Sequence, residues 1–597
     1  MKAKPFLLSL LAAGLALVTG PAPAQEPFAK LVGDVPVGEV QKGDALSVPY
    51  ILWGGDVATF LANGGLETRP TSLFHGQGLN LKLTPGDDFP GQVKNYLSGK
   101  TPFLRGTLSM LGQASEVIGK DPRTRPVVFL QLTWSAGDHL VARPNCQTLN
   151  DLKGKKIALQ KFGPHAGMLG DVLRTARLKW SDITPVWTDD VTGPKGPAEL
   201  FRKDAGVDAC FAISPDMLAL TGGLDKTGTG DKGTVKDAHV LVSTVQMKHS
   251  IADVYACRKD FFDTHKELVE KFAAGYLKAS EELTDLRKQA QDKNAGAAAK
   301  YKAILQTAMR IYGKEALPSE DDADGLVGDA VFVGLPGNVS FFTDKGNLSG
   351  FDAKQKAALD LAVTLGNAKT AIEFLKPDFN YEEVRRLGGL KVLTVGKTTG
   401  IESGGGVIVN FTISFGAEQT EFDEVRYAQD FQDALDQASL FANAVMVIRG
   451  HADLSKLLSD FVRAGLEKGN LRREGFKGHY QYYWDGDKLD LGDTKKVIDL
   501  INKTDWTEAK QDPKGTLQAL QKLSKDRADS VKEAVLNYAK LRGIRLEPSQ
   551  FKAEGAGIRE PVAPQPRTDE EMARNRRVEF RLEKRSIETS SGGTIDY

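Results

Sequence analysis

Short apolar runs alternate with helical patterns through the first half of the chain, and this alternation limits the possible folds more than any other feature. Apolar runs with the length of buried strands lie at residues 48–53, 127–132, 156–160, 207–213 and 251–258. Helical patterns follow them, and one opens with the capping-box sequence Thr264-His265-Lys266-Glu267. Strands that alternate with helices in this way predict α/β organisation.

The length of the chain requires more than one core. At 597 residues, roughly three or four compact units are expected. The best boundary is the passage 381–406, which Gly388-Gly389 and Gly404-Gly405-Gly406 punctuate. We therefore expect one unit over 25–380, a linker over 381–406 and a second unit over 407–585.

The two ends of the chain are expected to lie outside these units. Lys2 and Lys4 precede the apolar run 6–18, and Ala22-Pro23-Ala24 matches a cleavage site, so residues 1–24 predict a secretory signal peptide. No later apolar run is long enough to predict a transmembrane segment. The polar tail 586–597 is expected to be disordered.

Composition narrows the possible functions. Lys plus Arg and Asp plus Glu number 78 each, so no excess positive charge favours nucleic acid, and no nucleic-acid partner is expected. Cys146, Cys210 and Cys257 contain no C-x-x-C pair, so after export one disulfide with one spare thiol is expected, in a pairing that the sequence leaves open. We find no hydrolase, metalloprotease or P-loop motif, and the eight histidines are not clustered. Neither catalytic residues nor a metal or cofactor is expected.

Three of the predicted strands run into helices with strong start signals. Asp56 follows Gly54-Gly55 and can cap a helix, Gly163-Pro164 precedes another, and Ser214 can cap a third that begins at Pro215. Helix N-termini that converge beyond the ends of strands favour a small anion or a carboxylate. Such junctions also occur in α/β domains without any ligand.

Four segments, in order, carry a family resemblance: Tyr96-Leu97-Ser98-Gly99-Lys100, Asp151-Leu152-Lys153-Gly154-Lys155-Lys156-Ile157-Ala158, Gly206-Val207-Asp208-Ala209 and the stretch 253–261. Residues 45–375 thereby resemble type II periplasmic substrate-binding proteins of ABC transporters. The most similar branch binds nitrate, sulfonate and taurine and includes the thiamine-pyrimidine synthases. The resemblance implies two α/β lobes that close on a small solute and deliver it to an ABC permease.

Positions matched to that family give the expected solute pocket: Trp53, Asp56, Thr59, Trp134, Ser135, Phe162, Gly163, His165 and Ser214. Aromatic rings would sandwich the solute, and N–H groups and hydroxyls would fix its polar end. Three alternatives stay open. Trp53 and Trp134 are equally explained as core residues, His165 as a solvated loop residue, and Asp56 as a cap first.

Near the C-terminus, Gly450-His451-Ala452-Asp453, Leu523-Ser524-Lys525-Asp526-Arg527-Ala528 and Asn575-Arg576-Arg577-Val578-Glu579-Phe580 resemble the signature of OmpA-like domains. Apolar runs near 407–415, 445–449 and 578–582 fit its strands. The resemblance implies an α+β domain that binds peptidoglycan, with Asp453 on the ammonium and Arg527 on the carboxylate of diaminopimelate. Asn575 and Arg576 would lie in the same pocket.

An ordinary surface ion pair between Asp453 and Arg527 is the alternative. A long insertion, 454–522, separates them and includes the aromatic-rich stretch 478–485. It could form a lid, a partner-binding surface or a neutral excursion.

Together these features predict a two-lobed type II periplasmic binding fold followed by an α+β OmpA-like domain. The expected function is binding of a small anionic solute for an ABC importer in a Gram-negative periplasm, with a noncovalent tether to peptidoglycan. The alternative is a wall-anchored sensor or envelope scaffold whose lobes no longer serve transport.

Overall fold

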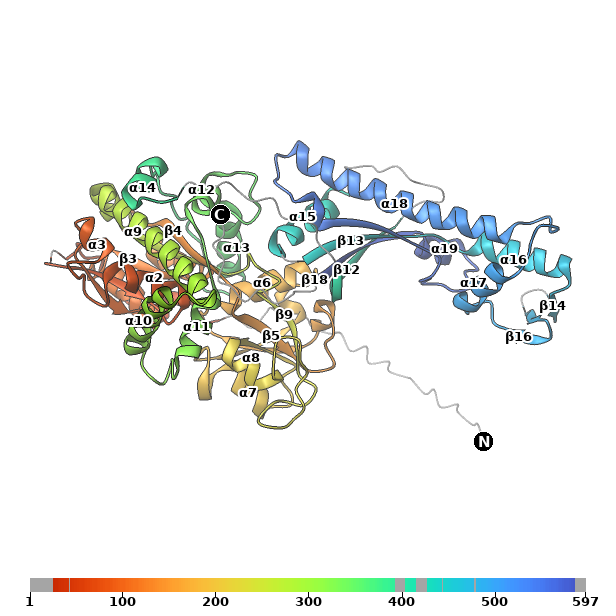
Figure 1. The fold of residues 1–597 in the computed structure, drawn as a ribbon, viewed down its shortest axis with the longest axis horizontal. Coiled ribbons are helices and arrows are strands. Elements are labelled where there is room, and N and C mark those ends of the chain that lie inside the picture. Colours follow the sequence, from red (N-terminus) through yellow and green to blue (C-terminus); the bar gives the residue numbers. More distant parts are fainter. Residues whose placement is uncertain are drawn as a thin grey trace, which may run out of the picture.

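The structure is a computed structural model that describes residues 25–41, 43–391, 403–414, 427–442, 444–476 and 479–585 (Figure 1). The expected signal peptide, the polar tail and much of the expected linker lie outside the described residues. The described part is a mixed α/β structure with five sheets, so the expected α/β organisation is confirmed. Within these ranges, no helix combines the length and apolarity needed to cross a membrane.

The first lobe has a four-stranded sheet in the order β11-β4-β10-β3 and a parallel pair β1-β2 beside it. Its strands are β1 Leu46–Tyr50, β2 Leu81–Pro85, β3 Phe103–Thr107, β4 Pro126–Ser135, β10 Ala252–Arg258 and β11 Ala330–Phe332. Its helices are α1 Phe28–Val32, α2 Gly54–Asn63, α3 Leu73–Gly76, α4 Phe89–Leu97, α5 Leu108–Gly119, α9 Lys259–Gln291, α10 Ala295–Tyr312, α11 Glu320–Gly328, α12 Leu335–Thr343, α13 Phe351–Thr364 and α14 Tyr381–Gly388.

Two details of this lobe bear on the sequence expectations. A helical segment begins at the predicted capping box 264–267, because His265, with a non-helical φ of −132°, forms a kink in α9, and a short helical segment from Lys259 precedes that kink. α14 packs on α9 with Val384 buried, so the first part of the expected linker is a helix of this lobe.

The second lobe has a five-stranded sheet in the order β7-β6-β8-β5-β9. Its elements are β5 Asp138–Ala142, β6 Lys156–Gln160, α6 His165–Thr175, β7 Thr184–Thr188, α7 Pro197–Lys203, β8 Ala209–Ile213, α8 Ser214–Thr221 and β9 His239–Ser243. The chain crosses between the lobes twice, from β4 into β5 and from β9 into β10. These two crossings, residues 136–137 and 244–251, connect the lobes, and we call them the hinge.

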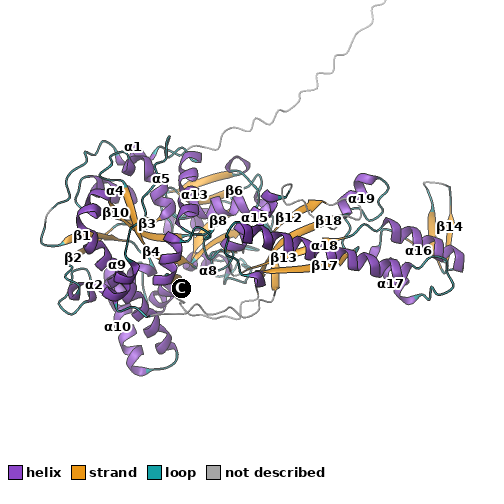
Figure 2. Cartoon of the chain, turned by 90° about the horizontal axis from the view of Figure 1, so that it is seen from above, coloured by secondary structure: helices purple, strands orange, loops and turns teal. Residues whose placement is uncertain are grey.

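The C-terminal domain has a four-stranded sheet in the order β12-β18-β13-β17, with the long helix α18 packed against it (Figures 1 and 2). Its elements are β12 Ser403–Ser414, α15 Ala428–Leu440, β13 Ala444–His451, α18 Pro513–Leu541, β17 Phe551–Gly557, α19 Asp569–Asn575 and β18 Arg577–Arg585. β13 pairs parallel with β17 and antiparallel with β18.

The insertion forms a small unit at the end of this domain remote from the lobes (Figure 1). It contains α16 Ser455–Lys468, β14 Leu471–Glu474, β15 Gln481–Trp484, β16 Asp487–Leu489 and α17 Thr494–Lys503. Phe461, Trp484 and Trp506 pack together in a core of its own. The aromatic-rich stretch noted in the sequence therefore contributes both to this core and to the exposed face of the β-hairpin that β14 and β15 form.

The cysteines differ from expectation. Cys146, Cys210 and Cys257 are all free thiols and all buried, so the expected disulfide is absent among them. Burial raises the pKa of Cys210 and Cys257 well above the ordinary thiol value, which leaves them weakly reactive.

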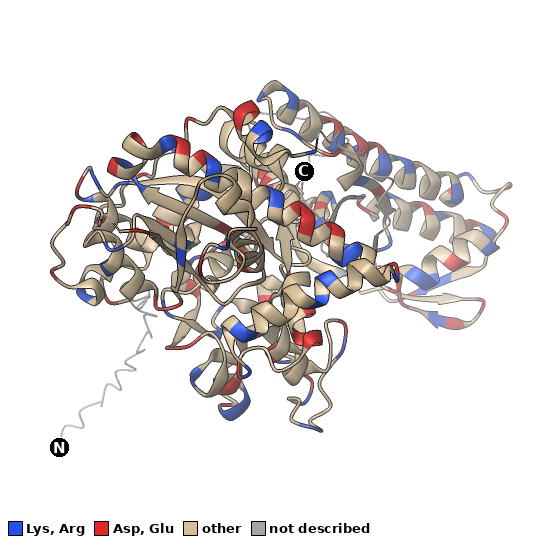
Figure 3. Cartoon of the chain, turned by 60° about the vertical axis from the view of Figure 1, so that its left-hand side comes forward, with Lys and Arg blue, Asp and Glu red and all other residues tan. Residues whose placement is uncertain are grey.

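Charged residues of both signs are interspersed in the view of Figure 3. Lys and Arg positions mix with Asp and Glu positions along the helices seen there, and neither sign dominates that view. This matches the equal totals of basic and acidic residues.

Candidate functional site

Four helices begin around the interface between the lobes. α2 and α5 follow β1 and β3 of the first lobe, and α6 and α8 follow β6 and β8 of the second. Thr107 caps α5 by accepting a hydrogen bond from the Met110 N–H. Pro164 is the N-cap of α6, so the helix predicted after Gly163-Pro164 is present.

A buried ion network occupies the first-lobe side. Arg105 Nη2 lies 2.8 Å from Asp56 Oδ2, and its Nη1 lies 2.8 Å from Asp253 Oδ1. All three residues are buried. Burial raises the pKa of Asp56 to about 7, the negative charge of Asp253 adds to the shift, and Arg105 opposes it. Asp56 is therefore held as an ion-pair partner at the third position of α2, and the expected capping role is wrong because the N-cap position belongs to Trp53.

Trp53 extends this network. Its Nε1 donates to Thr133 Oγ1 at 2.9 Å, and Thr133 Oγ1 donates to Asp253 Oδ2 at 3.1 Å. Thr59 lies one turn after Asp56 in α2 and is fully buried. Trp53, Asp56 and Thr59 therefore share one helix start, as expected, but the partners that hold them, Arg105 and Asp253, carry no signal in the local sequence.

A second polar network lies where β4 passes into β5. Asp138 accepts hydrogen bonds from Ser135 Oγ and from His165 Nε2, the latter at 2.7 Å. His139 Nε2 lies 3.2 Å from Ser214 Oγ, and burial lowers the pKa of His139 to about 4. The structure thus brings Ser135, His165 and Ser214 together through two residues that the sequence did not single out.

His165 is completely buried and stacks on the Phe211 ring with 5.0 Å between ring centroids. The alternative of a solvated loop histidine is therefore wrong. Ser214 is the first residue of α8 and does not cap it, because Ile213 holds the N-cap position.

The remaining expected residues pack against apolar neighbours. Trp134 is 4% exposed and lies 4.9 Å from the His249 ring and 6.0 Å from the Phe341 ring, centroid to centroid, as the core alternative requires. Phe162 has a φ of 56° and packs edge-on against Phe28. Its left-handed backbone makes the turn that passes through Gly163 into α6.

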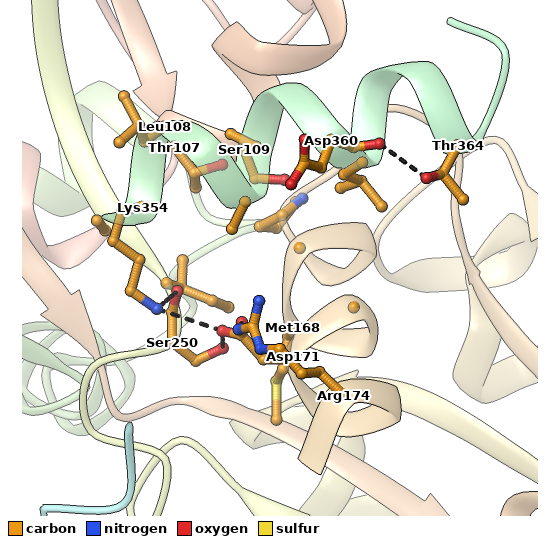
Figure 4. A pocket seen from close by; sticks show the side chains of 18 of the residues that line it. Thr107, Leu108, Ser109, Met168, Asp171, Arg174, Ser250, Lys354, Asp360 and Thr364 are labelled. Atoms are coloured by element: carbon orange, nitrogen blue, oxygen red, sulfur yellow. Dashed lines mark hydrogen bonds and ion pairs between the residues drawn. The ribbon is translucent and has the colours of Figure 1, made fainter. Parts of the chain in front are cut away.

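A cavity of about 170 Å³ lies between the lobes, beside these networks. The starts of α5 and α6, the second crossing and one face of α13 enclose it (Figure 4). Its polar lining includes Thr107, Ser109, Asp171, Arg174, Ser250 and Lys354. None of the nine residues expected from the sequence lines this cavity.

Lys354 is the buried cation of the cavity. Its Nζ lies 3.4 Å from Asp171 Oδ2 and 3.5 Å from the Ser250 carbonyl oxygen, and Ser250 Oγ donates to the same Asp171 oxygen at 2.8 Å. Burial lowers the pKa of Lys354, while Asp171 opposes the shift. Arg174 also pairs with Asp171, so two cations share one carboxylate on this wall.

Ser109 completes the polar wall on the side of the first lobe. Its Oγ is buried and, within the described part of the chain, has no hydrogen-bond partner. A buried hydroxyl without a partner is costly unless water or a ligand satisfies it. The lining holds hydroxyls, an ammonium and a guanidinium together with the carboxylates of Asp171 and Asp360, so it offers hydrogen-bond donors and acceptors to a small polar group.

A second cluster forms in the C-terminal domain from three segments far apart in sequence, and we call Asp453, Arg527, Asn575 and Arg576 the clamp cluster. Asn575 Nδ2 lies 3.4 Å from Asp453 Oδ1. Arg527, on α18, donates through Nη1 to the His451 carbonyl at 3.1 Å. Burial and the charge of Arg576 lower the pKa of Arg527, while the charge of Asp453 opposes them.

Asn575 has a clear structural role in this cluster. Its side chain accepts from the Ala563 N–H at 2.9 Å and donates to the Ala563 carbonyl at 2.8 Å. Both bonds are buried, so Asn575 fixes the loop before α19 next to Asp453. The insertion therefore leaves Asp453 and Asn575 in contact and Arg527 close enough to respond to the charge of Asp453.

His451, Glu560 and Glu579 lie beside the clamp cluster with metal-ligand spacing. Glu579 pairs with Arg577 and Arg581, and Glu560 with Arg449 and Arg581. These guanidinium groups already neutralise both carboxylates. The cluster therefore has no excess negative charge to attract a cation.

Comparison with known proteins gives one family match. Residues 72–290, just over a third of the chain, match the family described as NMT1/THI5 like. The matched segment runs from α3 into α9 and contains the whole second lobe. No curated protein sequence matches the chain.

Solved structures give distant matches to binding proteins. The ligand binding component of an ABC-type import system from Staphylococcus aureus is 13% identical, over 58% of this chain and 100% of that one, with a TM-score of 0.38. A putative periplasmic sulfonate-binding protein from Methylobacillus flagellatus is 15% identical, over 59% and 95%, with a TM-score of 0.38. The periplasmic nitrate-binding protein from Synechocystis is 11% identical, over 58% and 90%, with a TM-score of 0.37.

Proposed function

We propose that this protein binds a small anionic solute between its two lobes and serves an ABC importer, while the C-terminal domain tethers it to peptidoglycan. The observation that carries the solute-binding role is the cavity that both lobes and the hinge enclose, with a buried ammonium and a guanidinium in its wall. No chemical step is required, only lobe closure and release.

The cavity, rather than the nine residues expected from sequence, is the proposed solute site. Of those nine residues, Trp53, Asp56, Ser135, His165 and Ser214 lie in polar networks away from the cavity, and Trp134 and Phe162 pack against other rings. Ser109 and Lys354, in contrast, come from the first lobe and face Asp171 and Arg174 of the second (Figure 4). A solute held there would contact both lobes at once, which is what a closure mechanism requires.

The tether rests on the clamp cluster. A carboxylate, an amide and a guanidinium from three separate segments lie together, and this set can hold the ammonium and carboxylate of diaminopimelate. We propose this domain as OmpA-like and the protein as associated with the cell wall in the periplasm.

The solute-binding proposal is tested by ligand-dependent unfolding. A solute at a hundred times its dissociation constant should raise the free energy of unfolding by about 2.7 kcal/mol. Native mass spectrometry of protein purified without denaturation should identify a co-purified solute, and a library of sulfonates, carboxylates and inorganic anions provides the independent screen.

Lys354→Met should remove this stabilisation, because it deletes the buried ammonium but keeps most of the side-chain volume. Lys314→Met, at an exposed site just after α10, is the matched control and should retain it. Solute binding would be contradicted if no compound in the library raised the free energy of unfolding and if native mass spectrometry gave the mass of the protein alone. That result would favour a scaffold.

A further inference from the structure

The C-terminal domain contacts the second lobe through charged groups. Arg177, just after α6, places Nη2 2.7 Å from Asp430 Oδ1 and 2.7 Å from Asp433 Oδ2 on α15. Its guanidinium also lies 4.2 Å from the centre of the Phe411 ring on β12. One arginine of the second lobe therefore binds both a helix and a strand of the C-terminal domain.

Apolar packing strengthens this contact. The core of the second lobe and the core beneath the C-terminal sheet form one continuous cluster, with Ile408, Phe411 and Phe431 among its members. Within it, Gln437 Nε2 donates to the Thr175 carbonyl at 3.2 Å in a buried position. The C-terminal domain is thus fixed to the second lobe by a desolvated interface.

The same domain reaches the hinge and the first lobe by fewer contacts. At the end of α15, Ser439 accepts a hydrogen bond from His249 Nδ1 on its carbonyl at 2.8 Å, and its Oγ lies 2.7 Å from Ser349 Oγ. Arg545 Nη1 pairs with Asp344 Oδ2 at 3.1 Å. His249 belongs to the second crossing, whereas Ser349 and Asp344 belong to the first lobe.

We propose that the C-terminal domain is a brace across the hinge that holds the two lobes together and couples solute binding to the position of the wall-binding domain. The proposal rests on the proposed function, because it assumes that the lobes rotate about their two crossings. Since the brace contacts both lobes, rotation must break one set of contacts. The hydrogen bonds to the first lobe give way before the continuous core on the second.

This arrangement makes the coupling reciprocal. A solute that favours closed lobes also favours the seated brace, and a displaced brace lowers solute affinity by the same factor. A mechanical force on a wall-bound C-terminal domain would therefore change the equilibrium between open and closed lobes.

Gly346 offers a way to separate the brace from the first lobe alone. A Cβ at Gly346 would lie 2.1 Å from the Gly543 carbonyl oxygen of the C-terminal domain, a distance that forces a displacement. Its φ lies outside the left-handed region, so alanine is compatible with its backbone. Gly346→Ala therefore acts as a wedge at this contact.

The test measures the distance between the lobes in the full chain without added solute. Spin labels at Lys195→Cys on the second lobe and Lys300→Cys on the first occupy exposed sites, and the three native cysteines are buried. Double electron–electron resonance should give one narrow distance distribution for the parent protein. Gly346→Ala should add a longer-distance population and raise the open fraction at least about fivefold, at the lower end of typical coupling.

Two further variants make the result decisive. Arg545→Ala removes the ion pair to Asp344 without a steric wedge and should shift the distribution in the same direction. Gly325→Ala, where a Cβ meets nothing within 4 Å, should match the parent. Identical distributions for the parent, Gly346→Ala and Arg545→Ala, or a parent that is already broad, would overturn the brace. These readouts use no solute, so a failed solute screen leaves them interpretable.

Discussion

Asp329 lies where the two lobes meet. Its carbonyl accepts a hydrogen bond from the Ala136 N–H at 2.8 Å, and a Cβ at Gly137 would lie 2.5 Å from its carboxylate. Burial raises the pKa of Asp329 to about 6, a hydrogen bond from Ser214 opposes the shift, and the negative charge of Asp138 adds to it. The carboxyl of Asp329 is therefore a pH-sensitive element of the lobe interface.

Asp329→Asn should remove one part of the pH dependence of stability. Between about pH 4 and pH 6 the folded protein keeps a proton on Asp329 that the unfolded chain has lost, so the contribution of Asp329 to the free energy of unfolding falls as pH rises through this window. The stability of the variant relative to wild type should grow across the window and then level off. Urea unfolding at several pH values measures the difference, and a difference that does not change with pH would contradict this assignment.

At the residue scale, the sequence indicated which residues gather in a cluster better than it indicated which residues they contact. The motif spacing identified Asp453, Arg527 and Asn575, which the fold brings close together across the insertion. It gave no indication of Lys354, which reaches Asp171 from 183 residues away. Local sequence patterns indicate where helices start and strands end. A buried charged residue such as Lys354 can be recognised only from its partner, and the position of that partner depends on the whole fold.

At the scale of elements, α18 packs unusually close to the C-terminal sheet. A Cβ at Gly450 on β13 would lie 1.9 Å from the Ser524 carbonyl oxygen, and one at Gly555 on β17 would lie 2.8 Å from the Lys525 nitrogen. Two glycines on neighbouring strands therefore allow the helix backbone to approach. This approach places Arg527 beside the end of β13, where Asp453 follows.

Gly450→Ala should consequently destabilise the C-terminal domain by about 1–3 kcal/mol, the usual cost of overpacking. Gly76→Ala, where a Cβ meets nothing within 4 Å, should leave stability nearly unchanged. Chemical denaturation of the full chain followed by tryptophan fluorescence would show the difference. Equal stability of the two variants would contradict the close packing of α18.

The positions of the strands were largely predictable, because an apolar run of strand length indicates a strand that is buried in the core. β6 occupies 156–160 as expected, and β10, β13 and β18 lie within or around their predicted runs. Helix starts were partly predictable. The capping box at 264–267 lies at the kink of α9 at His265, where a helical segment begins, but the sequence gave no sign of the short helical segment from Lys259 that precedes it, with Phe261 and Phe262 buried.

At the scale of the whole molecule, two α/β lobes and a C-terminal domain form a continuous structure. The division of the chain into these parts and the insertion is predicted from their separate patterns and motifs. The sequence gives no sign that α15 contacts the hinge and both lobes, because the contacts involve residue types without a distinctive pattern, such as Ser349, Ser439 and Arg177. Under the proposed function, such a chain would couple the state of its solute site to the position of the wall-binding domain.

The attachment to peptidoglycan is the central claim, and cosedimentation of the full chain with purified sacculi tests it most directly. Asp453→Asn removes one charge at constant size, and Arg527→Lys keeps the charge but loses the planar fork that grips a carboxylate. Asp529→Asn, on the exposed face of the same helix, is the control. Wild type and Asp529→Asn should sediment with sacculi, whereas Asp453→Asn and Arg527→Lys, folded as judged by thermal unfolding, should remain in the supernatant. Sedimentation of both clamp variants at the wild-type level would contradict it.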